Sequence, residues 1–314
     1  MTKKLDPEKL PKHIAIIMDG NRRWARKKGL ADGKGHEEGS KNLQNIVEYC
    51  RDIGIKHLTV YALSTENWRK RSPEEVKGLF NLLIKIVQEK AEQYRKSGIK
   101  FFVLGNFQAF PLKVKNAIKK ILKMTVVEEK IQFNMALNYG GRDEIVTAVK
   151  KIIKDKIPAN KIDEKLISSY LYTKDQPDPD LIVRPGGEFR LSNFLLWQMS
   201  YAELYFTDIL WPDFSPKELE KVLIWYQDRD ICYMSSNDGI IIKTIDAGLT
   251  WKTLKTGTTE QIWGLYGTDK NTGYACGSRG LLMKTIDAGE TWEILPNPKI
   301  NLLQSIFFID KNIG

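Results

Sequence analysis

The first 230 residues alternate short apolar runs with longer segments of helical periodicity. The runs typical of strands are 13–18, 57–63, 100–105, 131–138, 181–184 and 202–207, and the segments typical of helices are 36–53, 73–97, 111–124, 142–154 and 215–227. Strands that alternate with helices of this length favour right-handed βαβ units. We therefore predict an α/β fold, a mostly parallel six-stranded sheet covered by helices.

The parallel sheet also predicts where a ligand would bind. In such sheets ligands occupy the region beyond the carboxyl ends of the strands. The segments that directly follow the predicted strands include Asp19–Arg23, Ser64–Trp68, Gly105–Asn106, Asn138–Gly141 and Arg184–Arg190. We expect the functional residues to come from these segments.

The rest of the chain contains a repeat. "GIIIKTIDAGLTWKTL" at 239–254 recurs as "GLLMKTIDAGETWEIL" at 280–295, a period of 41 residues (287 − 246), and "IDKNIG" at 309–314 echoes an earlier flank. A repeat of about 40 residues with β-type composition is typical of propeller blades. Because two blades are too few to close a ring of the usual 4–8, we predict a propeller fragment at 231–314, after an α/β domain at 1–230.

The repeated element itself has a known counterpart. T-x-D-x-G-x-T-W, at 244–251 and 285–292, resembles the Asp-box repeat of the bacterial neuraminidase type. The resemblance implies a hairpin turn made by the Asp and the Gly, with the Trp packed between strands. We interpret these residues as structural.

Composition narrows the class of protein. The net charge is +10, and the segment from residue 231 onward holds 8 Lys and Arg against 8 Asp and Glu, so the excess lies in the first 230 residues. A basic domain favours anionic partners, namely nucleic acid, an anionic membrane surface or phosphorylated substrates. No apolar run is long enough to cross a bilayer, and the N-terminus lacks the apolar segment of a signal peptide. Three cysteines without a CxxC pair indicate reduced thiols and a cytoplasmic protein, and three scattered histidines argue against a zinc site.

The stretch "HIAIIMDGNRRW" (13–24) places Asp19 at the exit of a buried strand. Gly20 and Asn21 leave backbone N–H groups for an anion, and Arg22 and Arg23 can neutralise it. An acid beside a diphosphate is well suited to Mg²⁺, which accepts one or two carboxylates together with substrate phosphates. The alternative is an Asp-Gly-Asn turn that caps a helix.

Three further features carry polar groups. "STENW" (64–68) follows the second strand, although it could equally be a helix N-cap with its Glu. "RPGGEFRLSN" (184–193) holds two arginines suited to bidentate contacts with phosphate. Glu203 lies among aromatic and aliphatic residues, where an acid is usually paired, with a metal as one possible partner. The apolar face of helix 73–97 could be ordinary core or could also wall a binding cavity.

Taken together, these motifs resemble the bacterial cis-prenyltransferases, typified by undecaprenyl diphosphate synthase. The resemblance covers residues 10–230 and rests on "HIAIIMDGNRRWA", "GHEEG", "TVYALSTENW", "NYGGRDEI" and "VRPGGEFRLSNFLLWQMSYAELYFTDILWPDF". It implies a homodimeric, Mg²⁺-dependent transferase of isoprenoid biosynthesis. Such an enzyme condenses isopentenyl diphosphate onto farnesyl diphosphate with Z geometry, giving a product such as undecaprenyl diphosphate, the cell wall lipid carrier. The enzyme would be cytoplasmic and would deliver its product to the membrane, with peripheral contact at its inner face.

The resemblance also implies roles for individual residues. Asp19 would assist departure of the allylic diphosphate, Asn67 is the family's candidate proton acceptor, and Asp19 and Glu203, the latter from the same or the partner subunit, would hold Mg²⁺. The substrate-binding residues would be Gly20, Asn21, Arg22, Arg23, Trp24, His36, Ser64, Thr65, Glu66, Trp68, Lys70 or Arg71, Arg184, Arg190, Leu191 and Ser192.

Two departures leave an alternative open. Asp32 stands where the family usually has an arginine, four residues before the "GH" histidine, and "ICYMSS" replaces an arginine-rich tail ending in "RFGG". The alternative is a catalytically impaired prenyltransferase-like interaction protein. A nucleic-acid-binding module would need a basic stripe with interleaved aromatic residues, and no such pattern is present.

Overall fold

The six predicted strands form one parallel sheet. The computed structural model describes residues 5–124, 126–228, 231–269, 271–296 and 301–308, and the chain divides into two units, Met1–Tyr226 and Gln227–Gly314. In the first unit the strands are β1 (His13–Ile16), β2 (His57–Ser64), β3 (Ile99–Leu104), β4 (Ile131–Tyr139), β5 (Leu181–Pro185) and β6 (Glu203–Thr207). Their order is β3-β4-β2-β1-β5-β6, and every neighbouring pair is parallel. The predicted fold class is confirmed.

The helices of this unit agree with the periodicity for the long elements. They are α1 (Asn21–Lys27), α2 (Asp32–Ile53), α3 (Thr65–Lys70), α4 (Pro73–Lys96), α5 (Leu112–Leu122), α6 (Gly141–Lys154), α7 (Glu164–Tyr170) and α8 (Pro216–Asp228). The short helices α1, α3 and α7 were not predicted as elements. Each has six or seven residues, which is too short for a helical period to stand out.

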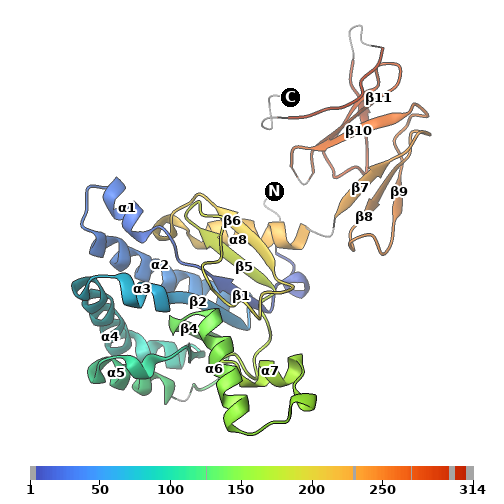
Figure 1. Cartoon of the computed structure of the whole chain (residues 1–314). Coiled ribbons are helices and arrows are strands. Elements are labelled where there is room, and N and C mark those ends of the chain that lie inside the picture. The colour runs from blue at the N-terminus through green and yellow to red at the C-terminus, as the bar shows by residue number, and fades with distance from the viewer. Residues whose placement is uncertain (1–4, 125, 229–230, 270, 297–300, 309–314) are drawn as a thin grey trace. The chain divides into compact units, whose positions relative to one another are not determined.

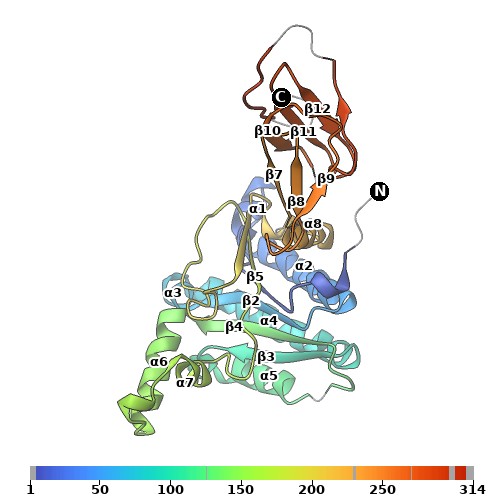
Figure 2. The ribbon, with the colours of Figure 1, turned by 90° about the vertical axis from the view of Figure 1, so that its right-hand side faces the viewer.

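The two faces of the sheet are covered differently. On β1, Ile14 and Ile16 belong to the large core that includes residues of α2, α4, α5 and α8. Ala15 of β1 and Ile17, which directly follows the strand, belong to a second core with Phe194 and Leu195. This alternation follows from the two-residue period of a strand. Figure 2 shows α4 and α5 close to the β3 edge, and Figure 1 shows α6 and α7 together.

The order of the strands places a switch point next to β1. From β1 the chain moves to β2, β3 and β4 on one side, and β5 and β6 then lie on the other side. Ligands of open α/β sheets bind at such a switch point, beyond the carboxyl ends. The segments that follow β1, β2 and β5 are therefore the ones that can build a site.

After the end of α8, the described residues of the second unit form β-strands and their connections. Strands β7 (Cys232–Ser235), β8 (Ile241–Thr244) and β9 (Lys252–Leu254) form an antiparallel sheet. A second antiparallel sheet holds β10 (Ile262–Gly267), β11 (Gly273–Gly277), β12 (Leu282–Thr285) and β13 (Glu293–Ile294). The predicted all-β composition of this region is confirmed, and its identification as propeller blades stays a prediction. The predicted boundary after residue 230 and the third echo at 309–314 involve positions outside the described residues.

The two repeated turns have the same hydrogen bonds. Asp246 accepts from the hydroxyls of Thr244 (2.7 Å) and Thr250 (2.5 Å), and Asp287 accepts from those of Thr285 (2.8 Å) and Thr291 (2.6 Å). These bonds, first those of Thr250 and Thr291, lower the pKa of each aspartate to about 2. The carboxylates are thus used by the turns themselves.

Among the described residues, no helix has both the length and the apolar character needed to cross a membrane.

Candidate active site

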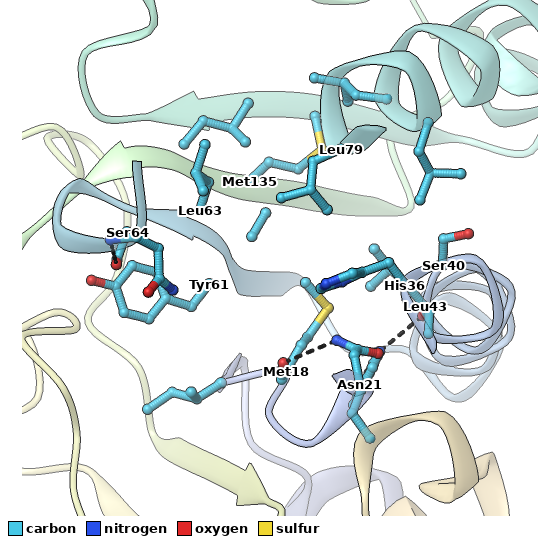
Figure 3. Close-up of a pocket in the computed structure, with 18 of the residues that line it drawn as sticks. Met18, Asn21, His36, Ser40, Leu43, Tyr61, Leu63, Ser64, Leu79 and Met135 are labelled. Atoms are coloured by element: carbon cyan, nitrogen blue, oxygen red, sulfur yellow. Dashed lines mark hydrogen bonds between the residues drawn. The ribbon is translucent and has the colours of Figure 1, made fainter. Parts of the chain in front are cut away.

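A cavity of about 740 Å³ lies beyond the carboxyl ends of β1, β2 and β5, with α2 and α4 beside it. Figure 3 shows its mixed character, because Leu63, Leu79 and Met135 converge on one side while Asn21, His36, Tyr61 and Ser64 lie on others. Of the predicted site residues, it is lined by Asp19, Asn21, His36, Ser64, Glu66, Asn67, Lys70, Arg71, Arg184, Arg190 and Ser192. The structure therefore brings together residues of the 13–24, 64–68 and 184–193 segments, whereas Glu203 and the predicted segments Gly105–Asn106 and Asn138–Gly141 do not line the cavity.

Asp19 is held between two arginines. Its Oδ2 accepts a 2.7 Å hydrogen bond from Nη2 of Arg184, and its Oδ1 accepts a 3.2 Å bond from Nη2 of Arg23. Partial burial raises the pKa of Asp19, but the bonds and charges of Arg184 and then Arg23 outweigh it and lower the pKa below its usual value. Asp19 is therefore an ionised carboxylate at neutral pH.

The register of the sheet explains why Asp19 and Arg184 lie within hydrogen-bond distance. Ile16 of β1 pairs with Val183 of β5 in parallel, so the residues that follow both strands leave the sheet at the same edge. The loop after β5 approaches closely because Gly186 has φ +103° and no side chain. A Cβ atom there would lie 3.1 Å from the backbone oxygen of Asp19 and 2.9 Å from Nη2 of Arg23.

Arg184 is almost fully buried and connects Asp19 to the "RLS" segment. Its Nη1 donates to Oγ of Ser192 at 3.0 Å and to the backbone oxygen of Arg190. The guanidinium of Arg190 pairs instead with Glu188. The two arginines thus have different surroundings: Arg184 is a buried connector, and Arg190 is an exposed cation that also lines the cavity.

The "STENW" motif serves two purposes at once. Ser64 is the N-cap of α3, since its Oγ accepts from the backbone N–H of Asn67 at 3.0 Å. The alternative interpretation as a helix N-cap is therefore correct in geometry, while Ser64, Glu66 and Asn67 also line the cavity. Trp68 does not line it; its ring centroid lies 5.4 Å from that of Phe80 and 5.1 Å from that of Phe110.

His36 belongs to a charged group at the junction of α2 and α4. Its Nε2 lies 3.8 Å from Oε1 of Glu75, and Arg71 pairs with the same oxygen at 3.2 Å. Burial, and then the charge of Arg71, lower the pKa of His36 to about 4. The imidazole is therefore neutral at pH 7 and can form hydrogen bonds there without adding a charge.

Asp32 pairs with two arginines of α1. It accepts from Nε of Arg22 at 2.7 Å and from Nε and Nη2 of Arg26 at 3.0 Å. Arg22 borders a second groove next to the cavity, which shares His36 and Arg71 with it. Arg22, which was predicted to bind an anionic substrate, is thus partly neutralised by an acid of the chain itself.

The other predicted residues lie around the cavity without lining it. Trp24 is buried and donates from Nε1 to Asp213 at 2.7 Å. Leu191 packs against the second core, and Oγ1 of Thr65 is buried with no hydrogen-bond partner among the described residues. Gly20 has φ +102°, and a Cβ atom there would lie 2.8 Å from Cδ2 of Leu210, so this position requires glycine.

Glu203 does not line the cavity. It begins β6 and pairs with Leu181, the first residue of β5, whereas Asp19 follows the opposite end of β1. The two acids therefore do not share a metal site within one chain. That Glu203 of a second chain completes the site stays a prediction.

The apolar part of the cavity extends under α4. Leu79, Leu83 and Ile86 line it, with Phe101, Phe133 and Met135 of the sheet opposite. Val76 and Ile84 of the same helix are buried in the core and do not line the cavity. The apolar face of 73–97 is thus divided between core packing and the cavity wall, which were the two predicted roles.

The site prediction missed several residues of the cavity, among them Ser40, Gln44, Tyr61 and Asn193. Asn193 lines it next to Ser192 and has φ +67°. Asparagine is enriched at left-handed positions among residues other than glycine, so the Ser-Asn pair at the end of "RLSN" was a usable signal.

Comparison with known proteins agrees with this geometry. A family model described as "Putative undecaprenyl diphosphate synthase" matches residues 17–233. An isoprenyl transferase of Fusobacterium nucleatum is 51% identical over 221 residues, 70% of this chain and 94% of that protein. A ditrans,polycis-undecaprenyl-diphosphate synthase, (2E,6E)-farnesyl-diphosphate specific, of Pasteurella multocida is 43% identical over 230 residues, 72% of this chain and 95% of that protein. The crystal structure of lavandulyl diphosphate synthase from Lavandula x intermedia in complex with dimethylallyl diphosphate has a TM-score of 0.67 and 35% identity, covering 70% of this chain and 96% of that one.

Proposed function

Because this chain belongs to the prenyltransferase family whose model is described as "Putative undecaprenyl diphosphate synthase", we propose that it condenses isopentenyl diphosphate onto farnesyl diphosphate. The product would be a Z-polyprenyl diphosphate such as undecaprenyl diphosphate. Each condensation breaks the bond between the allylic carbon and its diphosphate oxygen and forms a carbon–carbon bond. One diphosphate and one proton are released.

The observation that carries this proposal is the composition of this cavity. One end holds Asp19, Arg184, Arg190 and Ser192, and the other end is apolar. A prenyl diphosphate has the matching distribution, with a dianionic or trianionic head on a hydrocarbon chain. The cavity volume of about 740 Å³ lies in the usual range for ligand sites, roughly 300–1,000 Å³.

The residues at the polar end would act chiefly by binding and orienting diphosphate groups. Arg190 and Lys70 line the cavity with exposed cationic groups, and cations placed where charge develops stabilise a leaving group. Asn67 lies in the same cavity, as the family's candidate for receiving the proton. The neutral state of His36 adds a polar group without a further charge.

The donor set fits magnesium. Asp19 is ionised and lines the cavity, and one carboxylate together with phosphate oxygens is a set that Mg²⁺ accepts. When bound, Mg²⁺ would stabilise negative charge on the departing diphosphate. Asp19 would hold it jointly with the substrate.

The working form would be a homodimer, in which Glu203 of the second chain supports the metal site. Contact with an anionic membrane surface would be peripheral. Sedimentation velocity of the full chain tests the first point, since a monomer at micromolar concentration would contradict it.

One assay tests the reaction itself. The purified full chain is incubated with farnesyl diphosphate, labelled isopentenyl diphosphate and Mg²⁺, and butanol-extractable label is measured. We expect product that disappears with EDTA, and a loss of about 10³-fold in kcat for Asp19→Ala, within the range for removing a group that stabilises developing charge. The matched control is Asp52→Ala at the far end of α2, which should keep full activity. No product from the wild-type chain would contradict the proposal and favour the impaired interaction protein.

A further inference from the structure

The connection between β5 and β6 has an unusual backbone. Ser192, Asn193 and Leu195 have φ values of +51°, +67° and +44°. Residues with a Cβ atom rarely adopt this left-handed conformation. Such a run persists where surrounding contacts hold it, and it often lies at a functional site.

Asn193 supplies three of these contacts. Its Oδ1 accepts from the backbone N–H of Arg142 at 2.9 Å, its Nδ2 donates to Oε1 of Glu66 at 2.9 Å, and its backbone oxygen accepts from the N–H of Gly141 at 2.8 Å. The partners fix the orientation of the amide, because a backbone N–H can only donate and a carboxylate can only accept. One side chain therefore joins the start of α3, the start of α6 and the β5–β6 connection.

A glycine next to Asn193 leaves the space that its side chain occupies. Gly140 precedes α6, and a Cβ atom at that position would lie 2.7 Å from Nδ2 of Asn193 and 2.5 Å from Oγ1 of Thr65. Gly140, the first glycine of "NYGG", thus makes space for the amide of Asn193 between the starts of α3 and α6.

The neighbour of Asn193 faces the buried arginine. Oγ of Ser192 accepts from Nη1 of Arg184, whose other nitrogen contacts Asp19. The backbone oxygen of Ser192 also accepts a 3.3 Å hydrogen bond from the hydroxyl of Tyr61. A displacement of Asn193 would move Ser192 and Arg190 relative to Arg184.

We infer that Asn193 is a positioning residue for diphosphate binding: through Glu66 and Arg142 it sets Ser192 and Arg190 against Arg184. This inference rests on the proposed function for the identity of the substrate. It adds that the "STENW" and "RLSN" segments act as one unit, joined by the amide–carboxylate hydrogen bond.

The test reverses the polarity of that bond. Asn193→Asp keeps the acceptor for Arg142 but places a second carboxylate against Glu66. Glu66→Gln alone keeps an acceptor for Asn193. In the double variant, the amide of the new glutamine can donate to the new aspartate, which restores a hydrogen bond in the opposite direction.

We expect Asn193→Asp to raise KM for isopentenyl diphosphate about fivefold to twentyfold, with kcat reduced less. Because Glu66 itself lines the cavity, the double variant is compared with Glu66→Gln alone, and its KM should lie within about threefold of that variant, since the paired hydrogen bond is then restored. The matched control is Asn45→Asp, the same chemical change at an exposed position of α2, which should leave KM unchanged. Thermal unfolding of each variant measures stability separately.

The outcomes separate the inference from the proposed function. A KM that does not rise in Asn193→Asp, or that rises and is not rescued in the double variant, overturns the inference. An inactive wild-type chain contradicts the proposed function alone. Calorimetric titration with inorganic diphosphate then measures a dissociation constant for each variant. We expect these dissociation constants to follow the same order as the KM values. A dissociation constant that does not rise in Asn193→Asp, or that is not restored in the double variant, also overturns the inference.

Discussion

Arg184 donates a 2.7 Å hydrogen bond to Asp19, although 165 positions separate them in the chain. The arginine is nearly inaccessible to solvent, and its second terminal nitrogen reaches Ser192. This relationship connects the ends of β1 and β5 at the switch point of the sheet. It also makes Arg184 a shared support for the residues that we propose to bind substrate.

Replacing Arg184 by lysine should remove most of the activity. Lysine carries a single point charge and cannot form the forked contacts to Asp19, Ser192 and Arg190 together. We expect Arg184→Lys to lower kcat/KM about 100-fold or more, the effect of losing two charge-assisted hydrogen bonds. Arg279→Lys, the same change at an exposed position of the second unit, is the control. Activity within threefold of wild type would show that Arg184 is not needed.

Neutralising Asp32 should strengthen binding of the allylic substrate. Asp32 now occupies the guanidinium groups of Arg22 and Arg26, which the family resemblance assigns in part to diphosphate. We expect Asp32→Asn to lower KM for farnesyl diphosphate about twofold to fivefold, the size of an exposed ion pair. Asp52→Asn, on the same helix and also paired with an arginine, should change nothing. A higher KM would mean that Asp32 orders Arg22 instead of competing for it.

Filling the apolar part of the cavity should shorten the product. Leu83 lines the cavity on α4, so Leu83→Trp reduces the space for hydrocarbon. We expect products shorter by one or more isoprene units, measured by mass spectrometry of the dephosphorylated alcohols. Leu112→Trp at an exposed position of α5 controls for the added indole. An unchanged product length would show that the hydrocarbon chain of the product does not occupy this part of the cavity.

The buried His13 should make stability depend on pH. Its Nδ1–H donates to the backbone oxygen of Pro177 (2.8 Å), and its Nε2 accepts from Thr59 (2.7 Å), with His57 and Asp180 as its ionisable neighbours. Burial lowers its pKa from 6.5 to about 4. The unfolded chain therefore binds more protons between these values, and stability is lost as the pH falls from 6.5 to 4.

The size of this effect follows from the shift, because each pKa unit corresponds to about 1.4 kcal/mol, giving roughly 3 kcal/mol. Between pH 6.5 and 4, the unfolding free energy of the wild type should fall by roughly 3 kcal/mol more than that of His13→Gln. Urea titrations at both pH values measure it. Equal pH dependence of the two proteins would exclude His13 as the cause.

Two glycines of α2 should respond oppositely to alanine. A Cβ atom at Gly35 would lie 2.0 Å from the backbone oxygen of Asn21, whereas nothing lies within 4 Å at Gly33. We expect Gly35→Ala to destabilise the protein by about 1–3 kcal/mol. Gly33→Ala should stabilise it by about 0.5–1 kcal/mol through helix propensity. Equal effects in urea unfolding would show that α1 does not approach α2 as described.

The sequence alone predicted the long elements well, for a local reason. Ile14 and Ile16 alternate with Ala15 and Ile17, and this alternation reports a strand that is covered on both faces. The short helix Thr65–Lys70 was only one of two alternatives, because the polar "STENW" motif has no apolar face that would distinguish a helix from a loop. The parallel-sheet rule also located the polar end of the cavity, since Asp19, Ser64 and Arg184 all lie at or just beyond the carboxyl ends of strands.

Only the tertiary structure decided which side chains meet. The pairing of Asp32 with Arg22, the position of Glu203 at the other end of the sheet from Asp19, and the contact of Asn193 with Glu66 depend on strand register and on the paths of loops. The same holds for α4, where Leu83 faces the cavity and Ile84 the core. Periodicity determines which element a residue belongs to and which face it presents, because these are local properties of the backbone. The distance between two side chains on separate elements is set by how those elements pack, and no local pattern in the sequence encodes it.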